Sequence, residues 1–478
     1  MLKTKIICTL GPATDDEEIL RQLIKTGMNV ARMNFSHGDY PEHTQRIKTF
    51  KKIRSEFRSP VALMLDTKGP EVRLGTFKNG EAEIIAGQMF TLTTQAVEGT
   101  NEMVSISYAG LPNDLCKGNK ILIDDGLLEI VVDRIENEKI ICKVINGGTI
   151  SNQKSIYAPG VVLNIPYMRQ QDKDDLLFGI EHDIDFVSAS FVSSPDNILE
   201  LKDFLVKNNG SHINVIAKIE SQLGVDNVDA IITASDGIMV ARGDMGVEIP
   251  FENIPFIQKS LIKKCYSAGK RVIVATQMLD SMMRNPRPTR AETTDVANAI
   301  YDGTSAIMLS GETAAGKYPV ESLKTMVKIA KKTESDIHYR KRFDETHFSM
   351  RNTTDAISHA TCTTAHDLNA AAIITVTKSG HTARMVSKFR PDCMIIAAAI
   401  NETVWRQLAL SWGVYPIMTE IKCSTDELFD HVIERALEEK LIKNGDLIVI
   451  TGGVPLGVSG TTNILKVQIA DVPEISEN

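Results

Sequence analysis

Residues 213–221 read INVIAKIES, an apolar run that ends with a lysine and a glutamate two positions apart. Side chains alternate between the two faces of a strand, so Lys218 and Glu220 must point to the same side. Such a pair marks either an exposed edge strand with a surface ion pair or a functional site. Seven other runs of the same kind help to decide between these two interpretations.

Eight short apolar runs end in polar or glycine-rich signals, and helical patterns separate most of them. The runs span residues 5–12, 28–38, 61–70, 185–192, 213–221, 237–244, 271–278 and 306–313. Short apolar strands that alternate with helices pair in parallel through βαβ units. Eight such units predict an α/β fold of the TIM (β/α)8 barrel type.

The helical segments carry their own start and stop signals. In TDDEEILRQLIKTG (14–27) we expect a capping box between Thr14 and Glu17 and a stop at Gly27. In SPDNILELKDFLVKNNG (194–210), Pro195 stands near the start and Gly210 follows the end. Both segments are therefore predicted to be helices that connect barrel strands.

Residues 70–165 are rich in β-forming residues, have glycine, asparagine and aspartate at the turns, and show no helical period. We expect an inserted small β-barrel domain in one βα loop. Because βα loops form the mouth of a TIM barrel, this insert would lie over the mouth as a lid. The catalytic barrel domain would comprise residues 1–69 and 166–344. The strand–helix pattern then restarts, which predicts a C-terminal α/β domain with a mostly parallel open sheet over residues 345–478.

The composition excludes several classes of protein. Among 478 residues, 43% are apolar and 24% charged, and the net charge of −8 argues against a nucleic-acid partner. Seven cysteines without a C-x-x-C pattern indicate reduced thiols. The apolar run at the N-terminus is too short for a secretory signal, and no stretch approaches about 18 apolar residues. We therefore expect a soluble, cytoplasmic protein without a membrane partner.

Polar residues gather at the ends of six predicted strands, which is where TIM-barrel enzymes have their active sites. They are Arg32, Asn34 and Ser36; Asp66, Thr67 and Lys68; Lys218 and Glu220; Arg242, Gly243 and Asp244; Thr276 and Gln277; Ser310, Gly311 and Glu312. A purely structural barrel would not carry this polarity at so many strand ends. The functional interpretation of Lys218 and Glu220 is therefore favoured over the edge strand.

Glu220 and Asp244 are hard oxygen ligands at the ends of adjacent strands. Mg²⁺ or Mn²⁺ is typically held by one or two carboxylates, and substrate oxygens complete the coordination. Arg32 and Lys218 add positive charge that suits a phosphate or a carboxylate. In RGDMGVEIP (242–250), glycine amides stand at a possible helix start, where backbone N–H groups attract anions. These residues predict metal-assisted phosphoryl transfer or enolate chemistry on a small anionic substrate.

Long motifs spread over nearly the whole chain resemble those of the pyruvate kinase family. They are ICTLGPAT, NVARMNFSHGDY, LDTKGPEVR, KIES, MVARGDMGVEIP, ATQMLDSM, NPRPTRAE, DVANAIYDGTSAIMLSGETAAGKYP and SGTTN. The resemblance implies the glycolytic transfer of a phosphoryl group from phosphoenolpyruvate to ADP, which gives pyruvate and ATP. It also implies Mg²⁺ (or Mn²⁺) and K⁺ as cofactors and a homotetramer. Some bacterial members carry an extra C-terminal domain, which we do not expect here.

The resemblance assigns roles in phosphoryl transfer to four residues. Glu220 and Asp244 would hold the divalent metal, while Lys218 would stabilise charge on the transferring phosphoryl group. Arg32 would bind the phosphate.

The resemblance assigns further roles around the substrate and the nucleotide. The substrate carboxylate would be received by Gly243, Asp244 and Thr276. A water-linked route that protonates the enolate carbon would include Thr276, Ser310 and Glu312. The nucleotide would be bound by Asn34, His37, Arg73 and Lys154.

Family members usually bind K⁺ through the equivalents of Asn34, Ser36, Asp66 and the Thr67 carbonyl. K⁺-dependent members carry threonine, lysine and glutamate where this chain has Thr67, Lys68 and Glu71, and K⁺-independent members carry a lysine at the last position. We therefore predict activation by K⁺, since the ion supplies a positive charge that a lysine could otherwise provide.

One run departs from the family pattern. The family usually ends its inserted domain with lysine-glycine-valine-asparagine-leucine-proline-glycine, whereas this chain reads KSIYAPG (154–160). Lys154 is retained, but its neighbours differ. Lid closure and nucleotide affinity are thus less well defined by the resemblance than the chemistry of the barrel.

The C-terminal segment TKSGHTAR (377–384) follows a predicted strand and enters a helix. Hydroxyl groups and glycine at a helix start suit a phosphate, although an ordinary strand-to-helix turn would also read this way. The resemblance implies that this loop holds the phosphate of an allosteric effector, with VPLGVSGTTN (454–463) lying over it. The effector-binding residues would be Thr377, Lys378, Ser379, Gly380 and Thr382.

Two other functions stay open at this point. A metal-dependent lyase or aldolase acting on pyruvate or an oxo-acid would explain the metal and enolate features, but neither the insert nor Arg73. A catalytically silent metabolite sensor would keep only the C-terminal phosphate site, although Lys218, Glu220, Asp244 and Thr276 argue against it.

Overall fold

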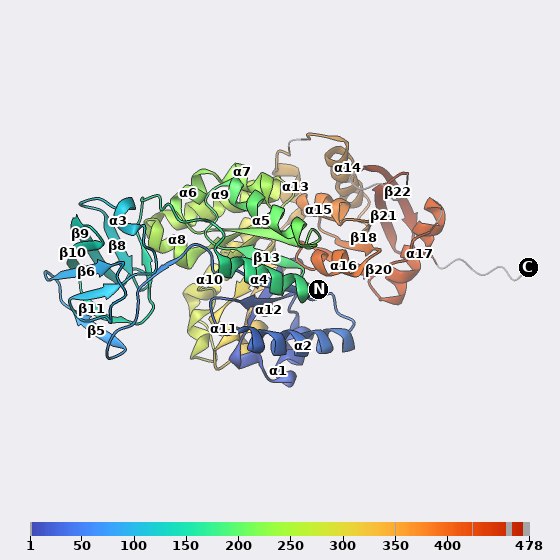
Figure 1. Ribbon diagram of the computed structural model, residues 1–478. Helices are drawn as coiled ribbons and strands as arrows, with labels where there is room; N and C mark the ends of the chain where they lie inside the picture. Colours follow the sequence, from blue (N-terminus) through green and yellow to red (C-terminus); the bar gives the residue numbers. More distant parts are fainter. Residues whose placement is uncertain (1, 349, 423, 456–460, 472–478) are drawn as a thin grey trace, which may run out of the picture.

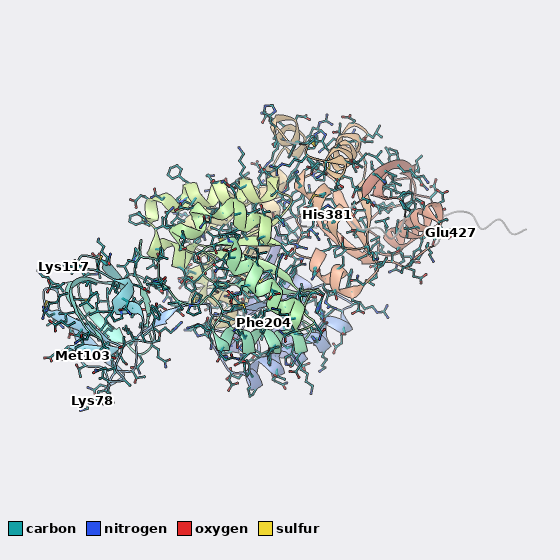
Figure 2. All side chains as sticks on the ribbon, turned by 45° about the horizontal axis from the view of Figure 1, so that its top comes forward. Lys78, Met103, Lys117, Phe204, His381 and Glu427 are labelled. Carbon is teal, nitrogen blue, oxygen red and sulfur yellow. The ribbon has the colours of Figure 1, made fainter. Side chains whose placement is uncertain are left out.

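The computed structural model describes residues 2–348, 350–422, 424–455 and 461–471. Figure 1 shows a β-rich body at one end, a barrel wrapped by helices in the middle, and a sheet covered by helices at the other end. Figure 2 shows the same order from another side, with Lys78, Met103 and Lys117 in the β-rich body and His381 and Glu427 in the C-terminal body. The insert and the C-terminal region thus lie at opposite ends of the barrel.

The eight predicted apolar runs form one closed barrel of parallel strands, in the order β1-β17-β16-β15-β14-β13-β3-β2. The TIM-barrel prediction is confirmed. The strands are β1 (Lys5–Leu10), β2 (Val30–Asn34), β3 (Ala62–Asp66), β13 (Phe186–Ala189), β14 (Asn214–Ile219), β15 (Gly237–Ala241), β16 (Arg271–Ala275) and β17 (Ala306–Leu309). Their residues are mostly buried because helices cover the outside and side chains fill the inside, so the runs read as continuously apolar.

Helices on the outside of the barrel connect these strands or follow the last of them. They are α1 (Glu17–Thr26), α2 (Tyr40–Glu56), α4 (Gln170–Glu181), α5 (Pro195–Lys207), α6 (Gln222–Asp226), α7 (Val228–Ala234), α8 (Arg242–Glu248), α9 (Ile254–Ser267), α10 (Arg290–Asp302), α11 (Gly311–Ala314), α12 (Pro319–Asp336) and α13 (Tyr339–Glu345), with 3-10 turns η1 (Pro12–Thr14), η2 (Phe251–Asn253) and η3 (Asp280–Met283). No helix in the described part of the chain is long and apolar enough to cross a membrane.

The capping box expected at Thr14 is wrong. Asp16 caps α1 instead, because its side chain accepts hydrogen bonds from the backbone N–H groups of Glu18 and Ile19. The Thr14 hydroxyl is used inside η1, where it bonds with Gly11. The stop signal is correct, since Gly27 ends α1 with a φ of 127°.

The insert consists of a seven-stranded sheet in the order β4-β12-β8-β9-β10-β6-β7 and a two-stranded sheet of β11 and β5. A bridge between Leu74 and Ile106, next to the two edge strands, curls the larger sheet toward closure. One helical turn, α3, was not predicted. The elements are β4 (Val72–Arg73), β5 (Glu81–Ile84), β6 (Met89–Thr93), β7 (Met103–Ser105), α3 (Leu111–Asp114), β8 (Lys120–Ile123), β9 (Leu128–Glu136), β10 (Lys139–Asn146), β11 (Gly148–Ser151) and β12 (Ser155–Tyr157).

The C-terminal region forms a five-stranded open sheet in the order β20-β19-β18-β21-β22, parallel except for β22. Its elements are α14 (Thr353–Asp367), β18 (Ala372–Thr377), α15 (His381–Lys388), β19 (Met394–Ala399), α16 (Glu402–Leu408), β20 (Val414–Met418), α17 (Thr425–Glu438), β21 (Leu447–Gly453) and β22 (Thr462–Ile469). Strand β20 contains Pro416, which is tolerated because β20 lies at the edge of the sheet. The domain limits given in the sequence analysis stay a prediction.

Candidate active site

The carboxyl ends of the barrel strands open into a cavity of about 900 Å³, here called the mouth pocket. Barrel residues and residues of the insert line it together. They are Arg32, Asn34, Ser36, His37, Asp66, Lys68, Glu71, Arg73, Asp125, Ser155, Tyr157, Ser190, Phe191, Lys218, Glu220, Met239, Ala241, Asp244, Thr276, Met308 and Ser310. Most residues predicted from the strand ends therefore meet in one place, although Thr67, Arg242, Gly243, Gln277, Gly311 and Glu312 are not part of this lining. Lys154 of the insert is not part of it either.

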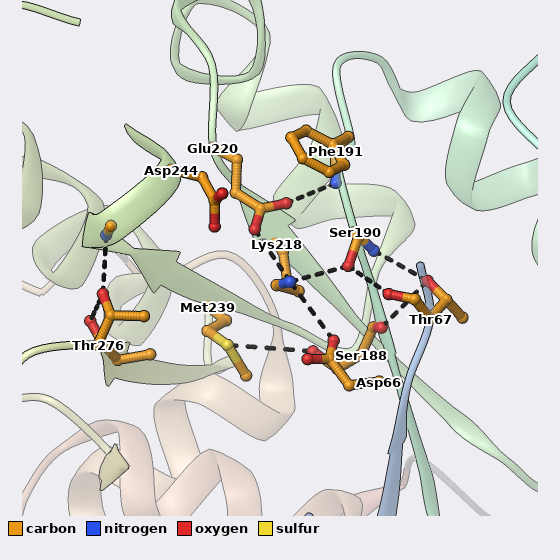
Figure 3. A network of polar contacts seen from close by, with 12 residues as sticks. Asp66, Thr67, Ser188, Ser190, Phe191, Lys218, Glu220, Met239, Asp244 and Thr276 are labelled. Carbon is orange, nitrogen blue, oxygen red and sulfur yellow. Dashed lines mark hydrogen bonds and ion pairs between the residues drawn. The ribbon is translucent and has the colours of Figure 1, made fainter. Parts of the chain in front are cut away.

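Lys218 lies at the centre of a network of buried polar groups (Figure 3). Its Nζ is 2.9 Å from Oε1 of Glu220 and 3.5 Å from Oδ1 of Asp66, and it donates a hydrogen bond of 2.8 Å to the Ser190 hydroxyl. Burial opposes the charge, but Asp66, Glu220 and Asp244 together hold the pKa of Lys218 above its ordinary value. The ammonium group therefore stays charged in the pocket.

Arg32 and Asp66 form a buried ion pair below this network. Both are nearly inaccessible, with exposed fractions of 7% and 1%. Burial alone would raise the pKa of Asp66, but the charges of Arg32 and Lys218 keep it below its ordinary value. Arg32 also donates to the Thr9 hydroxyl at 3.0 Å, which fixes its direction toward the mouth pocket.

Glu220 is completely buried just after β14. Its Oε2 accepts a hydrogen bond of 2.6 Å from the Phe191 backbone N–H, whereas Oε1 faces Lys218 and accepts no hydrogen bond within the described residues. Burial raises the pKa of Glu220, and the nearby charge of Asp244 adds to this effect against the opposing charge of Lys218. A further cation nearby would stabilise the charged form of such a buried carboxylate.

Asp244 is in the first turn of α8, directly after β15. Its Oδ1 accepts a hydrogen bond of 2.7 Å from the Tyr157 hydroxyl, which belongs to the insert. The neighbouring Gly243 N–H donates to the Thr276 hydroxyl at 2.8 Å. Thr276 has a φ of 68°, a left-handed conformation that costs energy for a β-branched residue and is typical of functional sites.

Ser310 and Glu312 follow β17. The Ser310 hydroxyl is buried and has no hydrogen-bond partner among the described residues, although it lines the mouth pocket. Glu312 lies beneath it and accepts hydrogen bonds from the backbone N–H groups of Ser310 at 2.7 Å and Leu279 at 3.0 Å. Burial raises the pKa of Glu312. Glu312 therefore orders the loop that presents Ser310, and the free hydroxyl can bind a water.

The predicted nucleotide side of the pocket is only partly assembled. Arg73 Nη2 lies 2.8 Å from Glu71, and His37 is near enough to Arg73 for that charge, together with burial, to lower the pKa of His37. Lys154 instead pairs with Asp124 at 2.7 Å on the insert. Arg73 and His37 thus face the mouth pocket, whereas Lys154 is held outside it.

The residues predicted for K⁺ adjoin one another at the ends of β2 and β3. Asn34 and Ser36 line the mouth pocket with Asp66, and the Asn34 side chain accepts a hydrogen bond from the Ser36 N–H. The Thr67 carbonyl accepts a hydrogen bond of 2.7 Å from Ser190. Amide, hydroxyl, carboxylate and carbonyl oxygens of this kind suit a hard cation.

Two carboxylates, Glu220 and Asp244, fit a divalent ion such as Mg²⁺ or Mn²⁺. Within the described residues no group of three or more histidine, cysteine, aspartate or glutamate side chains is arranged as a metal cage. Mg²⁺ usually takes one or two carboxylates and leaves its other positions to water and substrate oxygens. The donor set therefore fits an open site that substrate completes.

Several pocket residues were missed by the sequence reasoning because they come from loops. Ser190 and Phe191 follow β13, where Phe191 has a φ of 55°, and both contact the network around Lys218. Asp125 lies in a turn of the insert with a φ of 53°. The DDG sequence at 124–126 marks that turn, but no local signal shows that it reaches the mouth pocket.

A second cavity, also about 900 Å³, lies in the C-terminal region and is here called the effector pocket. Four of the five predicted effector residues line it, namely Thr377, Lys378, Ser379 and Thr382. Gly380 is the N-cap of α15, with a φ of 75°. Residues 456–460 of the segment predicted to lie over this loop are outside the described part of the chain.

Comparison with known proteins gives consistent results over the whole chain. A family model for the pyruvate kinase barrel domain matches residues 1–323, and one for the pyruvate kinase alpha/beta domain matches residues 355–468. A pyruvate kinase from Clostridium acetobutylicum is 52% identical over 473 residues, which is 98% of this chain and 100% of that protein. A pyruvate kinase from Bacillus licheniformis is 49% identical over 98% of this chain and 80% of its own length.

The fold is also similar to that of a solved pyruvate kinase structure. The crystal structure of a pyruvate kinase from Cryptosporidium parvum superimposes with a TM-score of 0.93 at 39% identity. The match covers 98% of this chain and 96% of that protein.

Proposed function

The chain belongs to the pyruvate kinase family and is a phosphotransferase; we propose that it transfers the phosphoryl group of phosphoenolpyruvate to ADP in the mouth pocket. The observation that carries the proposal is the buried ammonium group of Lys218, flanked by Asp66 and Glu220 and close to Asp244. A fixed cation beside two candidate metal ligands stabilises the charge that spreads over a phosphoryl group during transfer.

Lys218 and Arg32 would act on the phosphoryl group itself. Both are held by buried carboxylates, so they need little reorganisation when the reaction begins. Arg32 would bind the phosphate of the substrate, and Lys218 would stabilise the phosphoryl group as it leaves the enolate oxygen. Arg73 and His37 would then face the phosphates of the accepting nucleotide.

Glu220 and Asp244 would hold the divalent metal, which would supply positive charge to offset the negative charge that develops on the substrate. The Gly243 N–H and Thr276 lie beside Asp244, where they can receive the substrate carboxylate. The hydroxyl groups of Thr276 and Ser310 would carry a water that delivers a proton to the enolate carbon. Glu312 would keep this loop in place.

K⁺ would lie near Asn34, Ser36, Asp66 and the Thr67 carbonyl. Its charge would add to that of Arg32 and Lys218 on the phosphate side of the pocket. In the effector pocket, a phosphorylated sugar or nucleotide would place its phosphate against the loop that starts α15. Binding there would regulate activity at the barrel mouth.

We also propose a homotetramer that works in the cytoplasm. The side chains of Phe251 in η2 and Phe256 in α9 are 80% and 75% exposed. Two strongly exposed phenylalanines so close in the sequence are unusual. Exposed aromatic residues are enriched at protein–protein interfaces. Their burial between copies of the chain would remove this apolar surface from water.

The proposed metal site can be tested by Mn²⁺ binding without any substrate. We expect Glu220→Gln and Asp244→Asn each to weaken Mn²⁺ binding by about 100-fold, because each removes one of two charged ligands. Asp226→Asn is the matched control, since Asp226 is exposed on α6, shortly after Glu220, and does not line the mouth pocket. Unchanged Mn²⁺ binding in both site variants would refute the metal assignment.

A further inference from the structure

Tyr157 connects the insert to a proposed metal ligand of the barrel. It is the last residue of β12, its side chain is buried with 5% exposed, and its hydroxyl donates to Oδ1 of Asp244 at 2.7 Å. Asp244 is on α8 of the barrel, 87 positions away in the sequence. A hydrogen bond between these two parts forms only while the insert lies over the mouth pocket.

The insert touches the barrel near this bond at other points as well. A Cβ atom on Gly126, in the turn that carries Asp125, would lie 3.7 Å from Val247 of α8. Within the insert, Ser155, two residues before Tyr157, donates to the Glu71 carboxylate and so ties β12 to the first residues of the insert. The turn that carries Gly126 therefore packs against α8, the helix that carries Asp244.

Asp244 is surrounded by other carboxylates that repel it. Asp125 and Glu220 line the mouth pocket together with Asp244, and Glu248 is on the same helix as Asp244. Repulsion of this kind favours a carboxylate that swings away toward water. A neutral hydroxyl can hold the Asp244 carboxylate in place and leave its negative charge for a metal. A lysine at the same place would cancel that charge.

The Tyr157 hydroxyl is suited to act as a permanent donor. The hydroxyl is buried and donates to Oδ1 of Asp244, and an ordinary phenol keeps its proton at neutral pH. Since Asp244 offers two oxygens with about four lone pairs, one hydrogen bond to Oδ1 leaves acceptor capacity for a cation. Tyr157 also lies within KSIYAPG, the run that departs from the family pattern.

We propose that Tyr157 is a positioning residue, which fixes the Asp244 carboxylate for the divalent metal and makes metal affinity depend on the insert covering the mouth. This inference rests on the proposed function, in which Asp244 and Glu220 hold that metal. Hydrogen bonds to ligating carboxylates typically contribute 10- to 100-fold to metal affinity. The KSIYAPG run would thus link the lid to the metal site.

The test measures the affinity of the full chain for Mn²⁺ alone, from the electron paramagnetic resonance signal of the free ion. Tyr157→Phe removes only the hydroxyl and keeps the buried ring, and we expect it to weaken Mn²⁺ binding by about 10-fold. In turnover assays, KM for Mg²⁺ should rise by a similar factor, while kcat at saturating Mg²⁺ changes little.

Tyr108→Phe is the matched control. Its hydroxyl donates to Oδ2 of Asp114 at 2.7 Å, so the same kind of bond is lost within the insert, and Tyr108 does not line the mouth pocket. We expect Mn²⁺ affinity to stay within about twofold of the wild type in this variant, a change of less than about 0.5 kcal/mol. A loss of affinity in the control would mean that any weakening of the insert has the effect, and would overturn the specific role of Tyr157.

The remaining outcomes separate the inference from the proposed function. If Asp244→Asn and Glu220→Gln weaken Mn²⁺ binding and Tyr157→Phe does not, Tyr157 has no positioning role but the metal site stands. Tighter Mn²⁺ binding in Tyr157→Phe would also overturn the inference, because the phenol would then compete with the metal. If neither carboxylate variant has an effect, the proposed function fails first.

Discussion

The mouth pocket and the effector pocket have similar volumes, about 900 Å³ each, but they are built from different chemistry. The mouth pocket is lined by four lysine and arginine residues and five carboxylates, most of which come from the ends of strands. The effector pocket is lined mainly by hydroxyl groups and by apolar residues such as Ile400, Leu428 and Phe429, and it has fewer charged side chains, among them Lys378, Lys422 and Glu420. Both are nevertheless expected to receive a phosphorylated compound.

The difference shows what each site has to do with its phosphate. In the mouth pocket, buried charges such as Lys218 and Arg32 are held rigidly by Asp66, so they can stabilise a changing charge distribution. In the effector pocket, the loop before α15 offers hydroxyl and N–H donors, which bind a phosphate without changing it. Removing a charge from the first pocket should therefore cost far more than removing a hydroxyl from the second.

The largest effect is expected for Lys218→Met. Removal of this cation should lower kcat by at least about 1,000-fold, since in the proposed mechanism Lys218 supplies the fixed positive charge of the transfer step. Mn²⁺ binding should survive because Glu220 and Asp244 remain. Lys202→Met is a suitable control, since Lys202 pairs with Asp236 at 2.9 Å on the outside of the barrel. Near-normal turnover in Lys218→Met would remove the contrast between the two pockets.

A smaller effect is expected for the monovalent cation. Glu71→Lys should reduce the requirement for K⁺, because a lysine at this position supplies charge where the ion would act. We expect the ratio of activity in K⁺ to activity in tetramethylammonium to fall from more than about tenfold toward one. A tenfold change corresponds to about 1.4 kcal/mol, which the interaction with a nearby unit charge can supply. Glu81→Lys, on an exposed strand of the insert, controls for the added charge. A ratio that stays unchanged in Glu71→Lys would contradict the K⁺ assignment.

The smallest effect is expected in the effector pocket. Thr382→Val removes a buried hydroxyl that bonds with Thr462 at 2.8 Å and lines the pocket. Loss of one neutral hydrogen bond of about 1 kcal/mol should weaken the activating compound about fivefold, as measured by calorimetry with hexose phosphates and AMP. Thr363→Val, whose hydroxyl bonds only within α14, is the control. If Thr382→Val weakened effector binding by as large a factor as Lys218→Met lowers kcat, the contrast between the two pockets would be wrong.

The barrel and much of its site could be predicted because strand alternation is a local property. Lys218 and Glu220 are two residues apart on one strand, so their meeting at 2.9 Å follows from the sequence. Tyr157 and Asp244 could not be paired in this way, because their contact depends on how a separate body lies over the barrel. The same holds for Ser190, which reaches Lys218 from a neighbouring loop.

Local errors had local causes. Thr14 and Asp16 are both good helix caps, and only the 3-10 turn that uses Thr14 decides in favour of Asp16. Pro416 weakens the strand pattern of β20, which lies at the edge of its sheet. Lys154 matches the family motif and pairs with Asp124 on the insert, and its role at the nucleotide stays a prediction.

The most direct test of the central claim is pyruvate formation from phosphoenolpyruvate and ADP by the full chain with Mg²⁺, in K⁺ and in tetramethylammonium. We predict rapid pyruvate formation with Mg²⁺ and K⁺, little without K⁺, and none when Mg²⁺ is chelated. Activity that is indifferent to K⁺ would contradict the monovalent site alone. No pyruvate in any salt, even with hexose phosphates or AMP added, would contradict the assignment of the mouth pocket as the site of transfer.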